Sequence, residues 1–404
     1  MIAIKPDRLL ADLRALAKFG QYKTGVDRIA FSPQDIEARQ WLALRYREAG
    51  LEASIDRFGT VYGAAPGVDK AILIGSHTDT VPCGGWLDGA MGVIYGLEIA
   101  RAAREGGGSA IGVDTVNFQD EEGTYLPCLG SRAMIGAVDE AAIAGAQSTD
   151  GRKLTDAIAG AGLTGEPRRL DPRRQVAFLE AHIEQGPRLE HSGNKVAIIT
   201  GIVGIRRLRV VSEGRADHAG TTPMGMRNDA LTPLLRLGTF VADRFTELAS
   251  SDTVWNIGRI EATPGAANVV PSGAQLSLEF RDPDVDLLSQ LEKAVADEIA
   301  RLNVAGARVT SEMTARLAPT PMDGGIADTF ERAARDLKFG YERMPSGAGH
   351  DAMFLATKIP SGMIFVPSIG GRSHDIAENT RDEDIVAGCQ VMARAAELLV
   401  RGRA

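Results

Sequence analysis

Three short apolar segments, each followed directly by metal-competent polar residues, constrain the fold of this chain more than any other feature. The segments are residues 71–75, 115–119 and 176–181, and they lead into His77, Asp120-Glu121-Glu122 and His182. Short apolar runs bounded by turn residues are typical of strands buried on both faces of a sheet. Because α/β sheets place ligand sites at the carboxyl ends of their strands, the pattern predicts one shared site.

Helical segments alternate with these strands. Residues 33 to about 48 are expected to form a helix. Ser32 can cap its beginning, and Pro33 fits the first helical position. Residues 89–104 carry apolar side chains at helical spacing. A strand at 363–366 and an amphipathic helix at 385–400 repeat this pattern near the end of the chain. The alternation predicts an α/β domain.

The stretch between residues 206 and 318 has a different pattern. It contains strand-like segments at 208–210, 254–260, 276–280 and 309–317, and helical segments at 229–248 and 285–302. The resulting order, β-α-β-β-α-β, is that of a ferredoxin-like split unit. We therefore expect an α/β catalytic domain made of residues 1–205 and 319–404, with a second domain, residues 206–318, inserted into it.

Charge and cysteine content exclude several function classes. The chain has 45 Lys and Arg against 53 Asp and Glu, a net charge of −8, with no basic cluster that would bind nucleic acid or an anionic membrane. No apolar stretch approaches the ~18 residues of a membrane span, and the first residues lack a signal peptide. Cys83, Cys128 and Cys389 are too scattered for a disulfide framework and are expected to be buried or partly buried thiols. These features predict a cytoplasmic protein.

The polar clusters at the strand ends have the composition of a metal site. Alternate residues at a strand end point the same way, so Asp79 can orient the imidazole of His77 while His77 binds a metal. Two interpretations without metal stay open: His77 and Asp79 could form a hydrogen-bonded pair in a turn, and residues 120–122 could be a solvated acidic loop. Asp88, His182 and His374 add further ligands, and such imidazole–carboxylate sets suit Zn, Mn or Co. Two ions sharing one bridging group would activate water for hydrolysis.

Six motifs in order carry a resemblance to a known family. They are Gly75-Ser76-His77-Thr78-Asp79-Thr80-Val81-Pro82, Asp88-Gly89, Asp120-Glu121-Glu122-Gly123, Glu180-Ala181-His182-Ile183-Glu184-Gln185-Gly186, His218-Ala219-Gly220-Thr221-Thr222-Pro223-Met224 and Ser346-Gly347-Ala348-Gly349-His350-Asp351-Ala352. The chain resembles the hydantoinase/carbamoylase family of metallo-amidases from about residue 10 to residue 400. That family includes N-carbamoyl-L-amino-acid hydrolases, allantoate amidohydrolases and β-ureidopropionases. Its catalytic domain is similar to that of dinuclear zinc aminopeptidases.

The resemblance implies a role for each site residue. It places His77, Asp88 and His182 on one metal ion, and Asp88, Glu122 and His374 on the other, with Asp88 bridging and Glu121 as the general base. Adjacent residues at a strand end diverge, so Glu121 and Glu122 should not both bind the same ion. Substrate contacts are implied for Gln185, His218, Asn268, Arg281 and the backbone of Gly349. The inserted domain is then a lid and dimerisation domain of a homodimer, in which His218 reaches the partner's site.

Two of these substrate contacts have a chemical reason. Arg281 offers a guanidinium fork that matches a substrate carboxylate, although it could instead pair with a neighbouring acid such as Asp282. His218 could stabilise the developing oxyanion. Neither His191 nor His350 is expected to bind metal; His191 should lie in a surface turn and His350 close to the site.

The leading hypothesis is hydrolysis of an N-carbamoyl-L-amino acid to the amino acid, carbon dioxide and ammonia. Allantoate and other N-acyl amino acids are alternative substrates. A peptidase function is disfavoured, because Gln185 follows the His182 cluster as it does in the amidases. A catalytically silent binding module is disfavoured by the intact ligand set and Glu121. Ile205, Cys83 and Tyr125 depart from residues common in the family, and Ile205 with Tyr125 suggests an apolar side-chain pocket that disfavours allantoate.

Overall fold

The computed structural model describes residues 2–107, 111–305 and 307–403, which fold into two compact units. Unit 1 comprises Met1–Thr200 and Pro321–Ala404, and unit 2 comprises Gly201–Thr320. The domain boundaries expected from the sequence, after residues 205 and 318, lie within a few residues of the ends of these units. Each unit is described below by itself.

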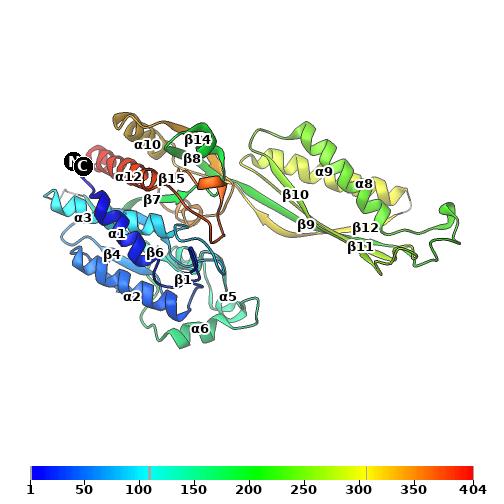
Figure 1. Cartoon of the computed structure of the whole chain (residues 1–404), viewed down its shortest axis with the longest axis horizontal. Coiled ribbons are helices and arrows are strands. Elements are labelled where there is room, and N and C mark those ends of the chain that lie inside the picture. The colour runs from blue at the N-terminus through cyan, green and yellow to red at the C-terminus, as the bar shows by residue number, and fades with distance from the viewer. Residues whose placement is uncertain (1, 108–110, 306, 404) are drawn as a thin grey trace. The chain divides into compact units, whose positions relative to one another are not determined.

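Unit 1 is built on a nine-stranded sheet (Figure 1). The strands lie in the order β13, β8, β15, β7, β5, β6, β4, β3, and β14 pairs with β8. Neighbours among β15, β7, β5 and β6 are parallel, while β8, β4 and β3 pair in the antiparallel sense. The bounds are β3 Glu52–Ile55, β4 Val61–Ala64, β5 Lys70–His77, β6 Ile111–Phe118, β7 Gln175–Ile183, β8 Val196–Ile202, β13 Thr320–Pro321, β14 Tyr341–Ser346 and β15 Ser361–Val366.

Helices pack against this sheet and form the main core with it. Ser32 caps α2 by accepting a hydrogen bond from the Asp35 backbone N–H, as its sequence predicted. Helix α3 packs on β5, β6 and β7 and is almost entirely buried. The helices are α1 Pro6–Leu16, α2 Pro33–Glu48, α3 Ala90–Glu105, α4 Leu129–Met134, α5 Glu140–Gly145, α6 Leu154–Ala161, α7 Arg188–Ser192, α10 Gly324–Asp336, α11 Ala352–Leu355 and α12 Asp382–Arg403. The α/β class predicted for this part of the chain is confirmed.

Unit 2 has the predicted order of elements. A four-stranded antiparallel sheet in the order β10, β11, β9, β12 carries two long helices, which share one apolar core with it. The elements are β9 Gly204–Glu213, α8 Leu231–Leu248, β10 Val254–Thr263, β11 Gly273–Asp282, α9 Val285–Val304 and β12 Arg308–Leu317. Burial alternates strictly along β11, because one sheet face packs on the helices and the other does not.

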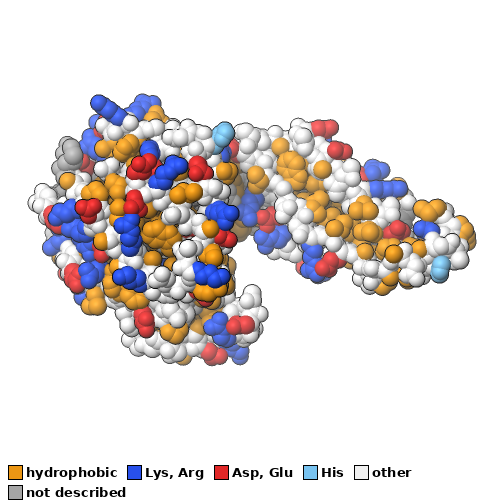
Figure 2. Space-filling model, viewed as in Figure 1, with side chains coloured by type: hydrophobic (Ala, Val, Ile, Leu, Met, Phe, Trp, Pro, Cys, Tyr) orange, Lys and Arg blue, Asp and Glu red, His pale blue; other side chains and the backbone are white. Residues whose placement is uncertain are grey.

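The surface agrees with the mixed charge of the sequence. On the face shown in Figure 2, positive and negative side chains are interspersed over unit 1. Among the described residues, no helix combines the length and the apolar character needed to cross a bilayer. Cys128 and Cys389 are buried thiols, whereas Cys83 is exposed, so the expectation of burial was wrong for that residue.

Candidate metal centre

The strand order of unit 1 brings the three polar clusters to one edge of the sheet. Strand β5 lies between β7 and β6, and all three are parallel. His77 is the last residue of β5, Asp120 lies just beyond the end of β6, and His182 is the penultimate residue of β7. Their carboxyl ends therefore converge, as the sequence predicted.

The first group of ligand atoms consists of His77, Asp88 and His182, all buried. Asp88 Oδ1 lies 2.9 Å from His182 Nε2 and 3.6 Å from His77 Nε2. Each imidazole donates its Nδ1 proton to a backbone carbonyl, of Asp79 for His77 and of Ile183 for His182, both at 3.0 Å. These bonds fix the rings so that Nε2 faces Asp88, which is the orientation a metal-binding imidazole needs.

The second group consists of Asp88, Glu122 and His374. His374 Nε2 lies 3.4 Å from Asp88 Oδ2 and 3.5 Å from Glu122 Oε2. The two carboxylate oxygens of Asp88 therefore face different groups, Oδ1 the first and Oδ2 the second. This is the arrangement of a carboxylate that bridges two ions.

Gly89 lets the Asp88 loop approach the first group. Its φ is +62°, a conformation that L side chains rarely adopt, and it precedes the first residue of α3. A Cβ atom here would lie 2.4 Å from the imidazole of His77. Packing against His77 therefore requires Gly directly after Asp88.

Glu121 and Glu122 diverge as their position beyond a strand predicts. Glu121 Oε2 lies 3.6 Å from His77 Nε2, on the side of the first group, whereas Glu122 faces His374 in the second. Glu121 also contacts Cys128, whose Sγ lies 3.7 Å from its Oε1. The structure thus leaves Glu121 beside the ligand groups without making it a member of either.

The buried carboxylates of the cluster are unfavourable in their charged form unless positive charge lies beside them. Burial and the neighbouring Glu122 raise the pKa of Glu121 well above its usual value, and burial with Asp88 raises that of Glu122 to about 9. Burial opposes the charged form of His182, but Asp88 beside it raises the His182 pKa to about 9. Glu122 Oε1 and Gln185 Oε1 are buried and have no hydrogen-bond partner among the described residues. Buried carboxylates and unpartnered oxygens in an imidazole–carboxylate set fit divalent cations. A bound cation would displace the protons that the raised pKa values otherwise keep on these groups.

Asp79 orients His77 in a different way from the one expected. The hydrogen bond to His77 Nδ1 comes from the backbone carbonyl of Asp79, while its carboxylate Oδ1 is 3.8 Å away. The carboxylate instead accepts the Glu122 backbone N–H at 3.2 Å and lies 3.5 Å from the buried guanidinium of Arg39. Asp79 therefore links the two ligand groups, because its carbonyl contacts His77 of the first and its carboxylate contacts the backbone of Glu122 in the second.

Sequence reasoning missed Arg39 and Ser373. Arg39 is 1% exposed and is held by Asp35 at 2.8 Å, an i,i+4 pair on α2 whose only sequence signal is its charge in a largely apolar helix face. Ser373 Oγ lies 3.0 Å from Asp88 Oδ2. Its position directly before His374 was the available signal.

The other predicted residues of unit 1 lie close to the ligand groups. Gln185 Nε2 donates to Asp88 Oδ2 at 2.9 Å. Gly349 precedes His350, whose buried ring lies 4.5 Å from that of His182 and belongs to neither ligand group. His191 is exposed, as expected, although it lies in the short helix α7 instead of a turn.

The three predicted residues of unit 2 do not lie together. His218 pairs with Val269, and the Ala219 N–H donates to the Asn268 carbonyl, beyond the end of β11 that begins at Gly273. Arg281 lies near the other end of β11, about eight residues or ~27 Å away. His218 and Asn268 therefore form one pair, and Arg281 is separate from both.

Arg281 and His218 each have defined partners. Glu279 accepts hydrogen bonds from Arg281 Nε and Nη2 at 2.9 and 2.6 Å, so Arg281 pairs with a neighbouring acid, as the alternative considered from the sequence had it, and that acid is Glu279. Asp282 instead accepts from Ser250 and Thr253. His218 Nδ1 accepts the Gly220 and Thr221 N–H groups, which leaves the proton on the exposed Nε2.

The residues that depart from the family pattern have different environments. Ile205 lies directly opposite Arg281 across the β9–β11 ladder, so the two side chains share one sheet face. Tyr125 packs its ring against Phe31 in a small buried cluster, which makes it a core residue and not a pocket residue. Cys83 has a φ of +53°, a conformation that Asn adopts readily.

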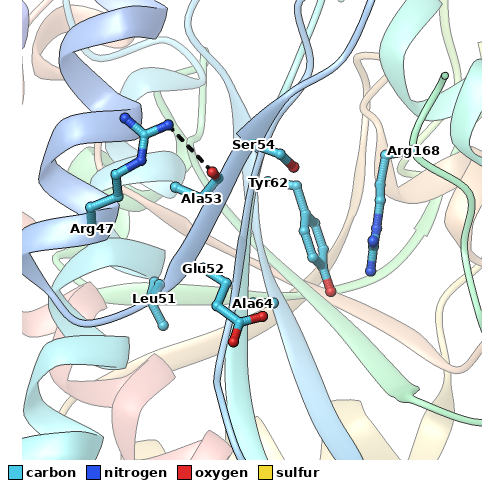
Figure 3. A pocket seen from close by; sticks show the side chains of 8 residues that line it. All are labelled: Arg47, Leu51, Glu52, Ala53, Ser54, Tyr62, Ala64 and Arg168. Carbon is cyan, nitrogen blue, oxygen red and sulfur yellow. Dashed lines mark hydrogen bonds between the residues drawn. The ribbon is translucent and has the colours of Figure 1, made fainter. Parts of the chain in front are cut away.

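A separate open pocket of about 450 Å³ lies at the β3–β4 edge of the sheet (Figure 3). Its lining contains none of the predicted site residues, and it is formed by Arg47, Leu51, Glu52, Ala53, Ser54, Tyr62, Ala64 and Arg168. The Arg168 guanidinium stacks 4.0 Å from the Tyr62 ring centre, and Arg47 donates to the Ala53 carbonyl. Both cations thus have partners within the fold.

Comparison with known proteins agrees with this geometry. Residues 73–398 match the family described as Peptidase family M20/M25/M40. The chain is 34% identical to an N-carbamoyl-L-amino-acid amidohydrolase of Paenarthrobacter aurescens, over 98% of both chains, and 33% identical to an allantoate amidohydrolase of Escherichia coli, over 94% of both. A crystal structure of a hydantoinase/carbamoylase family amidase from Burkholderia phymatum superposes with a TM-score of 0.93 at 43% identity, over 99% of this chain and 98% of that one. The chain therefore belongs to peptidase family M20/M25/M40 and, within it, to the hydantoinase/carbamoylase amidases that its motifs resemble.

Proposed function

We propose that this chain hydrolyses N-carbamoyl-L-amino acids to the amino acid, carbon dioxide and ammonia, using two divalent metal ions. Its family membership makes it a hydrolase of linear, non-peptide carbon–nitrogen bonds, the enzyme class that the motifs predicted. The observation that carries the proposal is the pair of ligand groups that share Asp88, with Glu121 beside them. The relatives named N-carbamoyl-L-amino-acid amidohydrolase, at 30–34% identity over nearly the full length, support the choice of substrate.

His77, Asp88 and His182 would hold one ion, and Asp88, Glu122 and His374 the other. The absence of Cys among these ligands favours Zn, Mn or Co bound by imidazole and carboxylate. Such ions, when bound, polarise a carbonyl group and lower the pKa of water. Asp79 orients His77 through its carbonyl and steadies the Glu122 main chain.

Glu121 is the group that moves protons in this proposal. Its carboxylate lies beside the first ligand group but is committed to neither, so it can accept a proton from the attacking water and pass it to the leaving nitrogen. Burial places it in an environment where carboxyl groups bind protons readily. Gln185, which donates a hydrogen bond to Asp88, would contact the substrate amide.

Arg281 would bind the α-carboxylate of the substrate. Glu279 holds the guanidinium group in a defined orientation, which reduces the cost of ordering it on binding. Ile205 lies beside it and offers an apolar contact for the substrate side chain. This neighbour favours carbamoyl amino acids with apolar side chains over allantoate, whose second ureido group needs hydrogen-bond partners.

The separation within unit 2 supports a homodimer. One small substrate cannot contact Arg281 and His218 of the same chain, because about 27 Å of strand lies between them. His218, with its Nε2 proton directed outward, and Asn268 would therefore serve the partner's site, where they stabilise the developing oxyanion. Met224 and Met226, close to His218 in the chain, are 77% and 68% exposed, which fits a loop that a partner covers.

The cytoplasmic location expected from the sequence belongs to the same proposal. Cys83, Cys128 and Cys389 are all free, as thiols are in a reducing compartment.

The test is a substrate panel on the purified protein, with N-carbamoyl, N-formyl and N-acetyl L-amino acids and allantoate. We expect the highest kcat/KM for an N-carbamoyl-L-amino acid with an apolar side chain. A preference for allantoate would support the alternative that the Escherichia coli relative suggests and would show that Ile205 does not set specificity. Metal binding without turnover of any compound would support a silent binding module.

A further inference from the structure

Glu378 is a buried carboxylate that belongs to neither ligand group. Its side chain is 2% exposed, and its Oε1 accepts the backbone N–H groups of Leu87 and Asp88 at 3.1 and 3.0 Å. Its Oε2 lies 3.1 Å from Ser373 Oγ, which also lies 3.0 Å from Asp88 Oδ2. One carboxylate therefore contacts the main chain of the shared ligand and the residue that precedes His374.

The loop around Gly85 is shaped to admit this carboxylate. A Cβ atom on Gly85 would lie 1.9 Å from the Glu378 carboxyl carbon and 1.9 Å from its Oε1. The φ of Gly85 is not in the left-handed region, so backbone conformation does not call for Gly here, and the atoms nearest to an added Cβ all belong to Glu378. The Gly84-Gly85 turn and Glu378, almost 300 residues apart in sequence, thus pack directly against each other.

We propose that Glu378 is a positioning residue that fixes Asp88 and the His374 segment relative to each other, and thereby sets the distance between the two metal ions. The inference rests on the proposed metal centre. The 85–88 loop supplies the ligand common to both ions, and the 373–378 segment supplies a ligand of the second ion alone. Without Glu378, the side chain of Asp88 would still be linked to Ser373 directly and through Gln185 Nε2, but the main chain of residues 87–88 would lose its hydrogen bonds to the 373–378 segment.

The chemistry of Glu378 distinguishes this role from that of a ligand. Its Oε1 already accepts two N–H groups, and its Oε2 faces a hydroxyl group. Gln at this position can keep all three contacts, because its carbonyl oxygen accepts the two N–H groups and its amide donates to Ser373. A metal ligand, in contrast, would lose affinity on this change because an amide is a far weaker donor to a divalent cation.

The experiment measures metal affinity, by competition with a chromophoric chelator, and urea unfolding in EDTA. Glu378→Ala and Gly85→Ala should each weaken binding of the second ion by about 10–100-fold, the usual effect of removing a group that orients ligands. Glu378→Gln should restore binding close to that of the wild type. The matched control is Asp56→Ala, which removes another buried carboxylate that accepts three backbone N–H groups but contacts no ligand, and should change stability alone.

The decisive comparison is the double variant Gly85→Ala with Glu378→Ala. Because the methyl group added at position 85 would then occupy the space of the missing carboxylate, Gly85→Ala should add little to the loss caused by Glu378→Ala. Equal losses in both backgrounds, or wild-type affinity in folded Glu378→Ala, would overturn the inference. If Glu378→Ala does not fold, unchanged affinity in Gly85→Ala would overturn it equally. A wild-type chain that binds no metal would instead refute the proposed function, and this inference with it.

Discussion

At the scale of single residues, Arg281 is proposed to bind the substrate carboxylate without taking part in the chemical step. Its guanidinium group is oriented by Glu279 and lies beside Ile205. Arg281→Lys should raise KM strongly and leave kcat comparatively unchanged, because an ammonium group cannot form the bidentate pair and a charge-assisted hydrogen bond contributes ~1.5–3 kcal/mol. Steady-state kinetics with an N-carbamoyl amino acid and its α-amide measure this, and the variant should discriminate less between them. An unchanged KM would assign the carboxylate to another residue.

Glu121 and Glu122, although adjacent, should give opposite results. Glu121→Gln should keep two bound ions and lower kcat by roughly 10²–10⁴-fold, the range for a lost general base. Glu122→Gln should lose the second ion, because Glu122 faces His374 and Asp88. Metal content by mass spectrometry and kcat on the same samples separate the two effects. Turnover lost from fully metallated Glu122→Gln, with Glu121→Gln unaffected, would reverse the assignment.

At the scale of elements, the sequence predicted most of what positions the site. The helix from Pro33 to Glu48 was marked by Ser32 and Pro33, and the three ligand-bearing strands by short apolar runs. The strand order β7, β5, β6 could not be read from the chain, because pairing partners are set by tertiary packing. The contacts behind the ligands were missed for the same reason, since Arg39 reaches Asp79 from a helix about 40 residues away.

Some elements had too little local signal to be predicted. Strand β4 has four residues and pairs antiparallel with β6, and β3, Glu52–Ile55, is equally short. The role of Asp79 was expected from its side chain but is played largely by its carbonyl group, which every residue carries. Backbone contacts of this kind leave no trace in residue identity.

The cap of α2 gives a prediction at this scale. Ser32→Ala removes the hydrogen bond to the Asp35 N–H and should lower the free energy of unfolding by about 1 kcal/mol. Metal content should not change, because Arg39 still pairs with Asp35. Urea unfolding measures the loss, and Ser289→Ala on the exposed face of α9 is the matched control, expected within about 0.5 kcal/mol of the wild type. A loss no larger than that of the control would show that the cap contributes nothing.

At the scale of the whole molecule, the distance between Arg281 and His218 supports the proposal that each complete site combines residues of two chains. Glu121→Gln and His218→Ala should each be nearly inactive alone. In their co-expressed mixture, about half of the dimers pair unlike chains and each has one complete site, so activity should recover to about a quarter of the wild type. Sedimentation establishes the dimer. No recovery in isolated mixed dimers would place His218 in its own chain's site.

The two ligand groups that share Asp88 are the centre of the proposed function, so the most direct test is metal removal and return. The purified chain, dialysed against a chelator, should lose hydrolysis of an N-carbamoyl-L-amino acid and regain it when Zn, Mn or Co is added, with full activity at about two ions per chain. Full activity in protein shown by mass spectrometry to be free of metal would contradict the proposal.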